Sequence, residues 1–391
     1  MNERIAFIGY RGTGKSAVAE ALGKKIKYEV FSIDSEVEKI IGMSISEFVS
    51  KNSWEAFRDV ESSLLKEAIV KKNVIIDCGG GIVERSENCS MLQSCSVVWL
   101  KASVPVIVSR IAAFNHRPSL TGKSILEEVE EVLQRRSPLY KKYSNYDIQT
   151  DDLSIPEITN DIVKKLLGLR IAVGITSKTV QEAVEEIVFC QRRADLVELR
   201  LDYINDISET LMDELLRACA IPQIVTVRKK DEGGFFNGSE DTRISLLVKA
   251  AQKKATFVDI EYSSGLRSIE KILNECTNTK LICSYHHFQE TPEHLEKTFD
   301  AMAKTGAHII KIACMGNTID DYVRIVNLIK KAKENNIRII ALLMGKYGKL
   351  SRVTSGLLGS YISTYAPIRN QKWVSGQLTY DEVIDLVCSL S

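Results

Sequence analysis

Short runs of apolar, often β-branched residues alternate with amphipathic stretches in the first part of the chain, up to about residue 168. The runs predict strands, the amphipathic stretches predict helices, and their alternation favours a parallel sheet covered by helices on both faces. The last helix ends at Leu167, and because Gly168 is a natural C-cap we put a domain boundary there. We expect strands at Ile5–Ile8, Val30–Ile33, Val74–Asp77, Val97–Leu100 and Asp147–Gln149, and helices starting at Lys15, Trp54, Val104, Ile125 and Ile155.

From residue 169 to residue 391 the strand–helix pattern continues, with almost no linker after the boundary. Eight strand–helix units over this length predict a (β/α)8 TIM barrel. That fold has its chemistry at the C-terminal ends of its strands, so polar residues at those positions are candidates for a site. The strands are expected at Ile171–Ile175, Leu196–Leu199, Gln223–Val227, Phe257–Glu261, Leu281–Ser284, Ile309–Ile312, Ile337–Leu342 and Tyr361–Thr364.

The composition argues against several classes of protein. With 391 residues, of which 45% are apolar, the chain is long enough for two domains with ample cores. A formal net charge of +1 gives no broad attraction to nucleic acid or anionic membranes, and no apolar run reaches the roughly 18 residues of a membrane helix. The nine cysteines form no C-x-x-C pair and indicate buried thiols, and residues 1–8 show no signal peptide. We therefore expect a cytoplasmic protein.

Residues 9–16 read Gly-Tyr-Arg-Gly-Thr-Gly-Lys-Ser and match the phosphate-binding pattern G-x-x-x-x-G-K-[ST]. The stretch follows an apolar strand and opens a helix, as in a P-loop NTPase-type sheet of three αβα layers. Glycines let backbone N–H groups close around phosphate oxygens, and the helix N-terminus adds partial positive charge. The lysine then reaches the β- and γ-phosphates, and the serine hydroxyl binds Mg²⁺. The predicted ATP–Mg²⁺ site consists of Gly9, Gly12, Thr13, Gly14, Lys15, Ser16 and Ala17.

Further residues of this half, in their order and spacing, resemble shikimate kinase over residues 1–168. They are Asp34, Phe57-Arg58-Asp59-Val60-Glu61, Gly79-Gly80-Gly81, Arg117-Pro118-Ser119-Leu120 and Arg136-Ser137-Pro138-Leu139-Tyr140. The resemblance implies that Asp34 accepts the proton of the substrate 3-hydroxyl, that Arg58 and Arg136 hold its carboxylate, and that the glycines approach its ring. It also implies that Arg117, on a lid, neutralises the transferring phosphoryl group, and that Arg110 lies near the adenine.

One position departs from the kinase pattern. The family usually carries a second acid two residues before Asp34, which orders water on the Mg²⁺, and this chain has Ser32 there. Asp77 instead stands at the end of the third predicted strand. We hypothesise that Asp77 and Ser16 form the metal site. The alternative is an aspartate that only accepts hydrogen bonds from nearby backbone amides.

In the second half, Lys311 interrupts the apolar run Ile309–Ala313. Burial in a barrel lowers a lysine pKa toward neutrality, and a neutral amine attacks a ketone to form an imine. The alternative is a lysine that snorkels or pairs with an acid. His286 follows the preceding strand directly and is a natural proton shuttle. The pattern therefore favours Schiff-base chemistry.

Strings at the strand ends resemble type I 3-dehydroquinate dehydratase over residues 170–391. They are Glu198-Leu199-Arg200-Leu201-Asp202, Arg228-Lys229-Lys230-Asp231-Glu232-Gly233-Gly234, Ser284-Tyr285-His286-His287-Phe288 and Ser351-Arg352. The resemblance implies that Lys311 forms a Schiff base with the substrate ketone, that His286 removes the adjacent proton, and that Glu232 orients His286. It implies a carboxylate clamp by Arg352 and no metal or organic cofactor. The remaining implied substrate contacts are Glu198, Arg200, Arg228 and Gln377.

The dehydratase pattern also has a departure. Before Gln377 the family commonly reads Ser-Ala-Pro-Gly-Gln, and this chain reads Trp373-Val374-Ser375-Gly376-Gln377. A hydroxyl that contacts substrate is thus replaced by Trp373, unless Ser375 takes its role.

Together the resemblances imply a bifunctional enzyme of the shikimate pathway, with an ATP-dependent shikimate kinase at 1–168 and a 3-dehydroquinate dehydratase at 169–391. One alternative keeps the kinase-like half as a non-catalytic or regulatory module, which Ser32 favours. Another is a small-acid kinase fused to an aldolase-type barrel. The expected partners are shikimate, ATP and 3-dehydroquinate, without nucleic acid or membrane. A homodimer and a separate shikimate dehydrogenase stay open.

Overall fold

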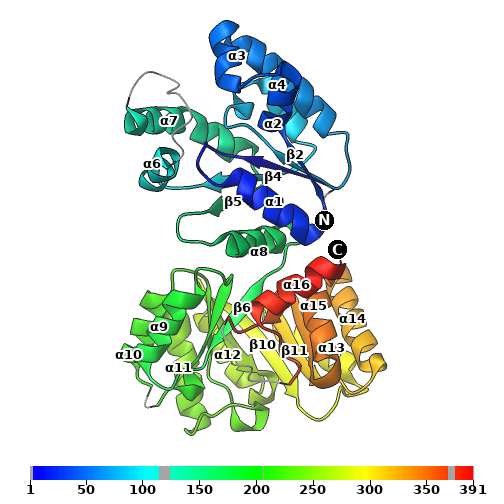
Figure 1. The fold of residues 1–391 in the computed structure, drawn as a ribbon. Helices are drawn as coiled ribbons and strands as arrows, with labels where there is room; N and C mark the ends of the chain where they lie inside the picture. Colours follow the sequence, from blue (N-terminus) through cyan, green and yellow to red (C-terminus); the bar gives the residue numbers. More distant parts are fainter. Residues whose placement is uncertain (1–2, 114–123, 206, 369–374, 391) are drawn as a thin grey trace. The chain divides into compact units, whose positions relative to one another are not determined.

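The computed structural model describes residues 3–113, 124–205, 207–368 and 375–390. Two compact units make up the chain, Met1–Leu167 with Cys388–Ser391, and Gly168–Val387 (Figure 1). In the described ranges, no helix combines the length and the apolar character needed to cross a membrane.

The first unit is a parallel five-stranded sheet in the order β2-β3-β1-β4-β5. Its strands are β1 Arg4–Ile8, β2 Glu29–Ser32, β3 Val74–Asp77, β4 Ser96–Lys101 and β5 Tyr146–Gln149. Its helices are α1 Lys15–Ile26, α2 Ile33–Ile41, α3 Ile45–Lys51, α4 Trp54–Ala68, α5 Ser86–Leu92, α6 Val104–Ala112, α7 Ile125–Tyr143 and α8 Ile155–Leu166, with the short 3₁₀ turn η1 at Ile82–Glu84.

The central strand β1 is buried on both faces, as expected for a parallel sheet between helices. Ala6 and Ile8 point to one face and pack in a cluster with Val37 of α2 and Leu65 of α4. Because side chains alternate along a strand, Phe7 points to the opposite face. The expected αβα layers are confirmed.

Helices α2, α3 and α5 were not expected from the sequence, and β2 ends one residue early because Ile33 opens α2. Asp34 and Glu36 lie in the first turn of α2, where carboxylates are favourable for the helix dipole. Gly42 caps its end with φ 69°. These capping signals are local, but the helix has only 9 residues, too few for its periodicity to stand out.

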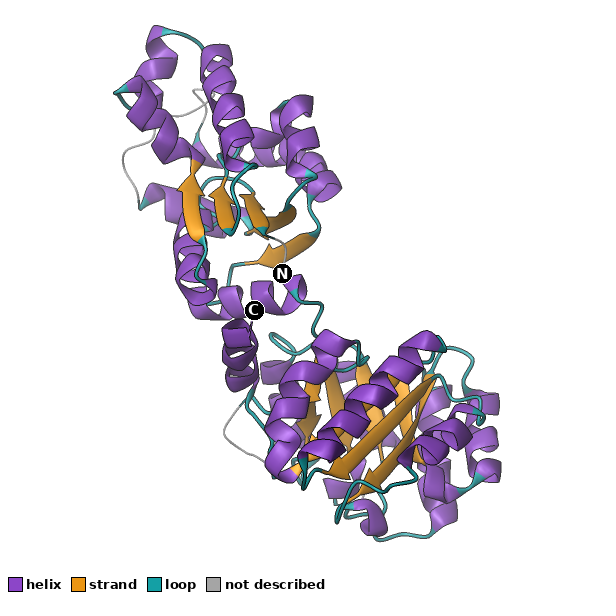
Figure 2. Cartoon of the chain, turned by 90° about the vertical axis from the view of Figure 1, so that its right-hand side faces the viewer, coloured by secondary structure: helices purple, strands orange, loops and turns teal. Residues whose placement is uncertain are grey.

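The second unit is a parallel eight-stranded sheet in the order β12-β11-β10-β9-β8-β7-β6-β13. Figure 2 shows these strands surrounded by helices. Its strands are β6 Ile171–Ile175, β7 Leu196–Arg200, β8 Gln223–Thr226, β9 Phe257–Glu261, β10 Lys280–His287, β11 Ile309–Met315, β12 Ile339–Met344 and β13 Thr364–Tyr365. Its helices are α9 Val180–Cys190, α10 Glu209–Ala218, α11 Glu240–Gln252, α12 Leu266–Glu275, α13 Leu295–Ala303, α14 Ile319–Glu334, α15 Gly348–Leu358 and α16 Tyr380–Leu390.

The barrel closes between β12 and the segment before β13, where the Tyr361 N–H donates to the Ile339 carbonyl at 2.6 Å. The expected (β/α)8 architecture is confirmed. The last strand is shorter than expected and begins at Thr364. Tyr361 instead contacts the Arg170 guanidinium, 4.5 Å from its ring centroid, and Phe257 at the start of β9. This aromatic pair fills the end of the barrel opposite the candidate site.

Candidate active sites

The phosphate loop between β1 and α1 has the backbone conformation that its glycines permit. Gly9, Gly12 and Gly14 have φ values of 137°, 80° and 92°, which side-chain-bearing residues rarely adopt. The Lys15 ammonium donates to the carbonyls of Gly9 (2.9 Å) and Tyr10 (3.1 Å). The loop thus combines positive charge with the N-terminus of α1, which fits a nucleotide phosphate.

The two residues expected to bind metal lie together. The Ser16 hydroxyl donates to Asp77 Oδ2 at 2.6 Å, and Asp77 is buried at the end of β3. In the β2–β3 pairing Ser32 is the register partner of Asp77. The carboxylate expected at position 32 is thus supplied by the facing position of the neighbouring strand. A hydroxyl and one carboxylate fit Mg²⁺, which usually keeps several waters and binds substrate phosphates.

A pocket of about 530 Å³ lies beside the loop and collects the residues expected to bind the acceptor substrate, Asp34, Arg58, Gly79, Gly80, Gly81 and Arg136. The glycines are required for this packing. A Cβ on Gly79 would lie 2.8 Å from Asp34 Oδ1, and a Cβ on Gly81 would lie 1.8 Å from the Arg58 guanidinium. The absence of a side chain at Gly81 thus makes room for the Arg58 guanidinium, and a side chain at Gly79 would displace the Asp34 carboxylate.

Sequence reasoning missed Glu84 of η1, which bonds both arginines of this pocket. Its carboxylate accepts from Arg58 (3.0 Å), from Arg135 (2.7 Å) and twice from Arg136 (3.0 Å each). Burial acts to raise the pKa of Glu84. The hydrogen bonds and charges of Arg136 and the other guanidiniums lower it by more, so the net shift is downward and the carboxylate stays ionised. Glu61 holds Arg58 from its other side at 2.7 Å. No sequence pattern pointed to Glu84, because only the fold brings it to these arginines.

Of the remaining kinase residues, Arg110 lies against the phosphate loop. It donates to the Gly12 carbonyl (3.3 Å) and to Thr150 at the end of β5. Arg117 lies outside the residues that the structure describes.

In the barrel, Lys311 on β11 is 6% exposed and forms two ion pairs. Its ammonium lies 3.2 Å from Glu198 Oε1 and 3.0 Å from Asp259 Oδ2. Burial lowers the pKa of Lys311, but the two carboxylates raise it more, so its pKa lies above the ordinary value. The expectation of an uncharged resting amine was therefore wrong, because the lysine is not buried alone.

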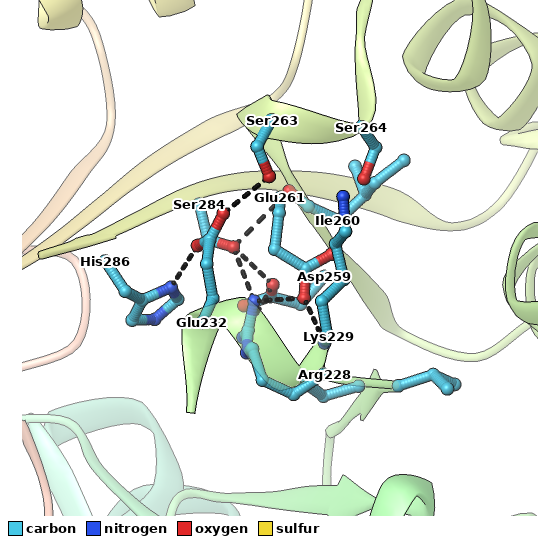
Figure 3. A network of polar contacts seen from close by, with 12 residues as sticks. Arg228, Lys229, Glu232, Asp259, Ile260, Glu261, Ser263, Ser264, Ser284 and His286 are labelled. Carbon is cyan, nitrogen blue, oxygen red and sulfur yellow. Dashed lines mark hydrogen bonds and ion pairs between the residues drawn. The ribbon is translucent and has the colours of Figure 1, made fainter. Parts of the chain in front are cut away.

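Asp259 on β9 is the main barrel residue that sequence reasoning missed. It also pairs with Arg228 at 2.8 Å and accepts from the Ser284 hydroxyl at 2.7 Å (Figure 3). Although burial raises the pKa of Asp259, the cations of Arg228 and Lys311 hold it below its usual range. A signal existed in the sequence. Asp259 interrupts an apolar strand as Lys311 does, and it lies two residues from Glu261, hence on the same face.

His286 and Glu232 form the pair that the resemblance implied. His286 Nδ1 lies 2.9 Å from Glu232 Oε2, and the Ser263 hydroxyl donates to Glu232 Oε1 at 2.6 Å (Figure 3). Burial, together with the cations Arg228 and Lys311, lowers the pKa of His286 well below 6.5. A neutral ring that donates from Nδ1 to a carboxylate leaves Nε2 as a proton acceptor.

Arg352 and Gln377 both lie against the end of β13. Arg352 Nη1 donates to the Tyr365 carbonyl at 3.3 Å, and Gln377 Nε2 donates to the same carbonyl at 3.0 Å. No carboxylate in the described part of the chain pairs with Arg352, and burial lowers its pKa to about 10. An unpaired buried guanidinium suits an anionic ligand. Arg200, by contrast, is held by both carboxylate oxygens of Asp202, at 2.9 and 2.7 Å.

Comparisons with known proteins were made for both halves. Residues 171–390 match the family model described as type I 3-dehydroquinase, and residues 11–167 match the model described as shikimate kinase, so both resemblances are confirmed. The chain is 25% identical over 421 residues to a pentafunctional AROM polypeptide of Kluyveromyces lactis, covering 99% of this chain and 26% of that relative. The chain thus spans about a quarter of that relative's length.

Two further relatives each match one half. A shikimate kinase of Thermodesulfovibrio yellowstonii is 37% identical over 164 residues, covering 42% of this chain and 94% of that relative. A crystal structure of 3-dehydroquinate dehydratase from Geobacillus kaustophilus has a TM-score of 0.52 at 25% identity, covering 57% of this chain and 91% of that chain.

The Ser16–Asp77 pair predicts how Mg²⁺ affects nucleotide binding. Removing the Asp77 charge should weaken ATP binding in the presence of Mg²⁺ about tenfold, or about 1.4 kcal/mol, and leave ATP binding in EDTA unchanged. Calorimetry on Asp77→Asn measures both. Asp147→Asn, a change at an exposed aspartate of the same sheet, serves as control. An unchanged Mg²⁺ effect in Asp77→Asn would rule out the metal role.

The environment of His286 predicts its titration. Because its pKa is lowered, the ring should stay neutral as the pH falls through 6.5 and take up a proton only well below that value. NMR titration of the imidazole carbons measures this, with His287→Gln used to assign the neighbouring ring. A midpoint at or above pH 6.5 would contradict the geometry described for the pair with Glu232.

Proposed function

The chain belongs to the type I 3-dehydroquinase family, and we propose that it is a bifunctional enzyme that dehydrates 3-dehydroquinate and phosphorylates shikimate. The dehydratase occupies residues 169–391 and the kinase residues 1–168. The observation that carries the dehydratase is Lys311 held inside the barrel, in one network of charges with the His286–Glu232 pair. A buried lysine amine near a proton-accepting histidine is the arrangement that imine formation on a ketone requires.

Dehydration begins with the amine. Lys311 passes its proton to one of the two carboxylates that bond it, Glu198 or Asp259, and its nitrogen then adds to the ketone carbon. The ketone oxygen takes up protons and leaves as water, which produces a protonated imine. Arg352 holds the substrate carboxylate during these steps, because it is a buried cation without a protein carboxylate among the described residues.

The imine acidifies the adjacent C–H bond. His286 Nε2 takes that proton, the electron pair moves into a carbon–carbon double bond, and the hydroxyl on the next carbon leaves. The imidazolium returns its proton to this hydroxyl, so that water is released. Glu232 keeps the ring in the required tautomer through the 2.9 Å contact with Nδ1. Hydrolysis of the imine frees Lys311 and the product.

In the kinase half, Asp34 accepts the proton of the substrate hydroxyl as it attacks the γ-phosphate of ATP. Arg58 and Arg136 hold the substrate carboxylate in the pocket, and Lys15 stabilises charge on the phosphates. Mg²⁺, when bound at Ser16 and Asp77, neutralises phosphate charge. Arg110 lies beside the loop that binds the nucleotide.

The two reactions do not connect directly. The dehydratase product keeps its ketone at the carbon where the kinase needs a hydroxyl, and neither proposed site transfers hydride. A separate shikimate dehydrogenase in the cytoplasm is therefore part of the proposal.

Borohydride trapping tests the dehydratase. We expect reduction in the presence of 3-dehydroquinate to attach the substrate skeleton to the chain, and peptide mapping to locate it on Lys311. Lys311→Ala should abolish both trapping and turnover. Lys280→Arg, a change at an exposed lysine, should retain both. Label on another lysine, or turnover by Lys311→Ala, would refute the assignment.

A coupled assay with ATP and shikimate tests the kinase. Asp34→Asn should lower kcat for phosphorylation about 10²- to 10⁴-fold through the loss of the general base, and leave dehydration unchanged. Asp59→Asn, at an exposed aspartate paired with Arg85, is the matched control. A wild-type chain that dehydrates its substrate but does not phosphorylate shikimate would instead favour a regulatory kinase-like half.

A further inference from the structure

Tyr365, the last residue of β13, carries a polar group that the mechanism above does not use. The residue is 9% exposed, and its buried hydroxyl oxygen has no hydrogen-bond partner at bonding geometry among the residues that the structure describes. The polar group beside it is the Lys311 ammonium, which has no acceptor to offer the phenol O–H. A buried hydroxyl without a partner is destabilising, and nearly all such groups in native structures are satisfied. The partner of this hydroxyl is therefore expected to arrive with a ligand.

The position of Tyr365 indicates which ligand. Its ring centroid lies 4.5 Å from the Lys311 ammonium, and its carbonyl accepts hydrogen bonds from Arg352 and Gln377. Tyr365 thus contacts three groups of the proposed dehydratase site. Arg352 Nε is likewise buried without a partner. Two unsatisfied groups of this kind, one guanidinium N–H and one hydroxyl, suit a small ligand rich in oxygen atoms.

Packing alone does not account for the hydroxyl. The Tyr365 ring belongs to an apolar cluster with Ala172, Ile340 and Leu342, and a phenylalanine ring would fill the same space without burying an oxygen. Burial raises the pKa of Tyr365 and outweighs the opposing effects of the Lys311 ammonium, which lowers the pKa through its charge and through its polar contact with the phenol. The phenol therefore keeps its proton at neutral pH and is a hydrogen-bond donor.

We propose that the Tyr365 hydroxyl is a further substrate-contacting group of the dehydratase site, which donates a hydrogen bond to the oxygen on the carbon that Lys311 attacks. This inference rests on the proposed dehydratase function. The phenol polarises the ketone and keeps its own proton, so every bond that forms or breaks remains with Lys311 and His286.

Tyr365→Phe tests the proposal, because it removes one oxygen and keeps the ring. We expect kcat/KM for 3-dehydroquinate to fall about tenfold, and borohydride trapping at saturating substrate to slow. The Tm should stay the same or rise, because the variant no longer buries an unsatisfied hydroxyl. Tyr361→Phe is the matched control, since that tyrosine packs against the same cluster and contacts Arg170 and Phe257. We expect it to retain wild-type turnover.

The outcomes separate the inference from the function on which it rests. An active wild type with an equally active Tyr365→Phe overturns the role of Tyr365 alone. A loss of turnover together with a lower Tm also overturns it, because the hydroxyl then supports the fold. A wild-type chain that neither dehydrates 3-dehydroquinate nor traps an imine overturns the proposed function, and the role of Tyr365 with it.

Discussion

The arrangement of charged side chains inside the barrel depends on one buried ammonium, that of Lys311, whose charge neighbouring carboxylates must balance. Lys311 is almost fully removed from water, and it stays charged only because Glu198 and Asp259 contact its nitrogen. Asp259 in turn needs Arg228, whose guanidinium also bonds Glu261. The result is a chain of alternating charges contributed by β7, β9, β11 and the loop after β8. The Lys311 proton therefore lies within hydrogen-bond reach of two acceptors, and in the proposed dehydratase reaction the first proton transfer takes place inside the site.

The same charges also affect the pKa of His286, the proposed proton shuttle. The cations Arg228 and Lys311 disfavour a second positive charge and so help to keep His286 neutral. The carboxylates of Asp259 and Glu261 oppose them, and Glu232 contacts Nδ1 directly. The amine and the imidazole thus shift in opposite directions for different reasons: two carboxylates keep Lys311 protonated, whereas burial and two cations keep His286 unprotonated. The imidazole is therefore ready to accept a proton, whereas the ammonium of Lys311 has to give one up before its nitrogen can act as a nucleophile.

In the kinase half the cations held in place by carboxylates are guanidinium groups. Arg58 and Arg136 line a common pocket, and the carboxylates of Glu61 and Glu84 fix their orientation by charge-assisted hydrogen bonds. The 79–81 glycine run removes the side chains that would collide with these groups. Preorganised cations beside a bare backbone suit a small carboxylate-bearing substrate, because little reorganisation is left for binding.

The sequence by itself determined the features that depend on local order. Strand and helix periodicity located the sheet and the barrel, the glycine–lysine motif located the phosphate loop, and one charge in an apolar run singled out Lys311. Tertiary structure decided the features that depend on register and burial. It set Asp259 against Lys311 and reversed the expected pKa shift, it put Asp77 beside Ser32, and it buried the Tyr365 hydroxyl without a partner. Electrostatic and hydrogen-bonding environments are made by neighbours from distant strands, which no local pattern specifies.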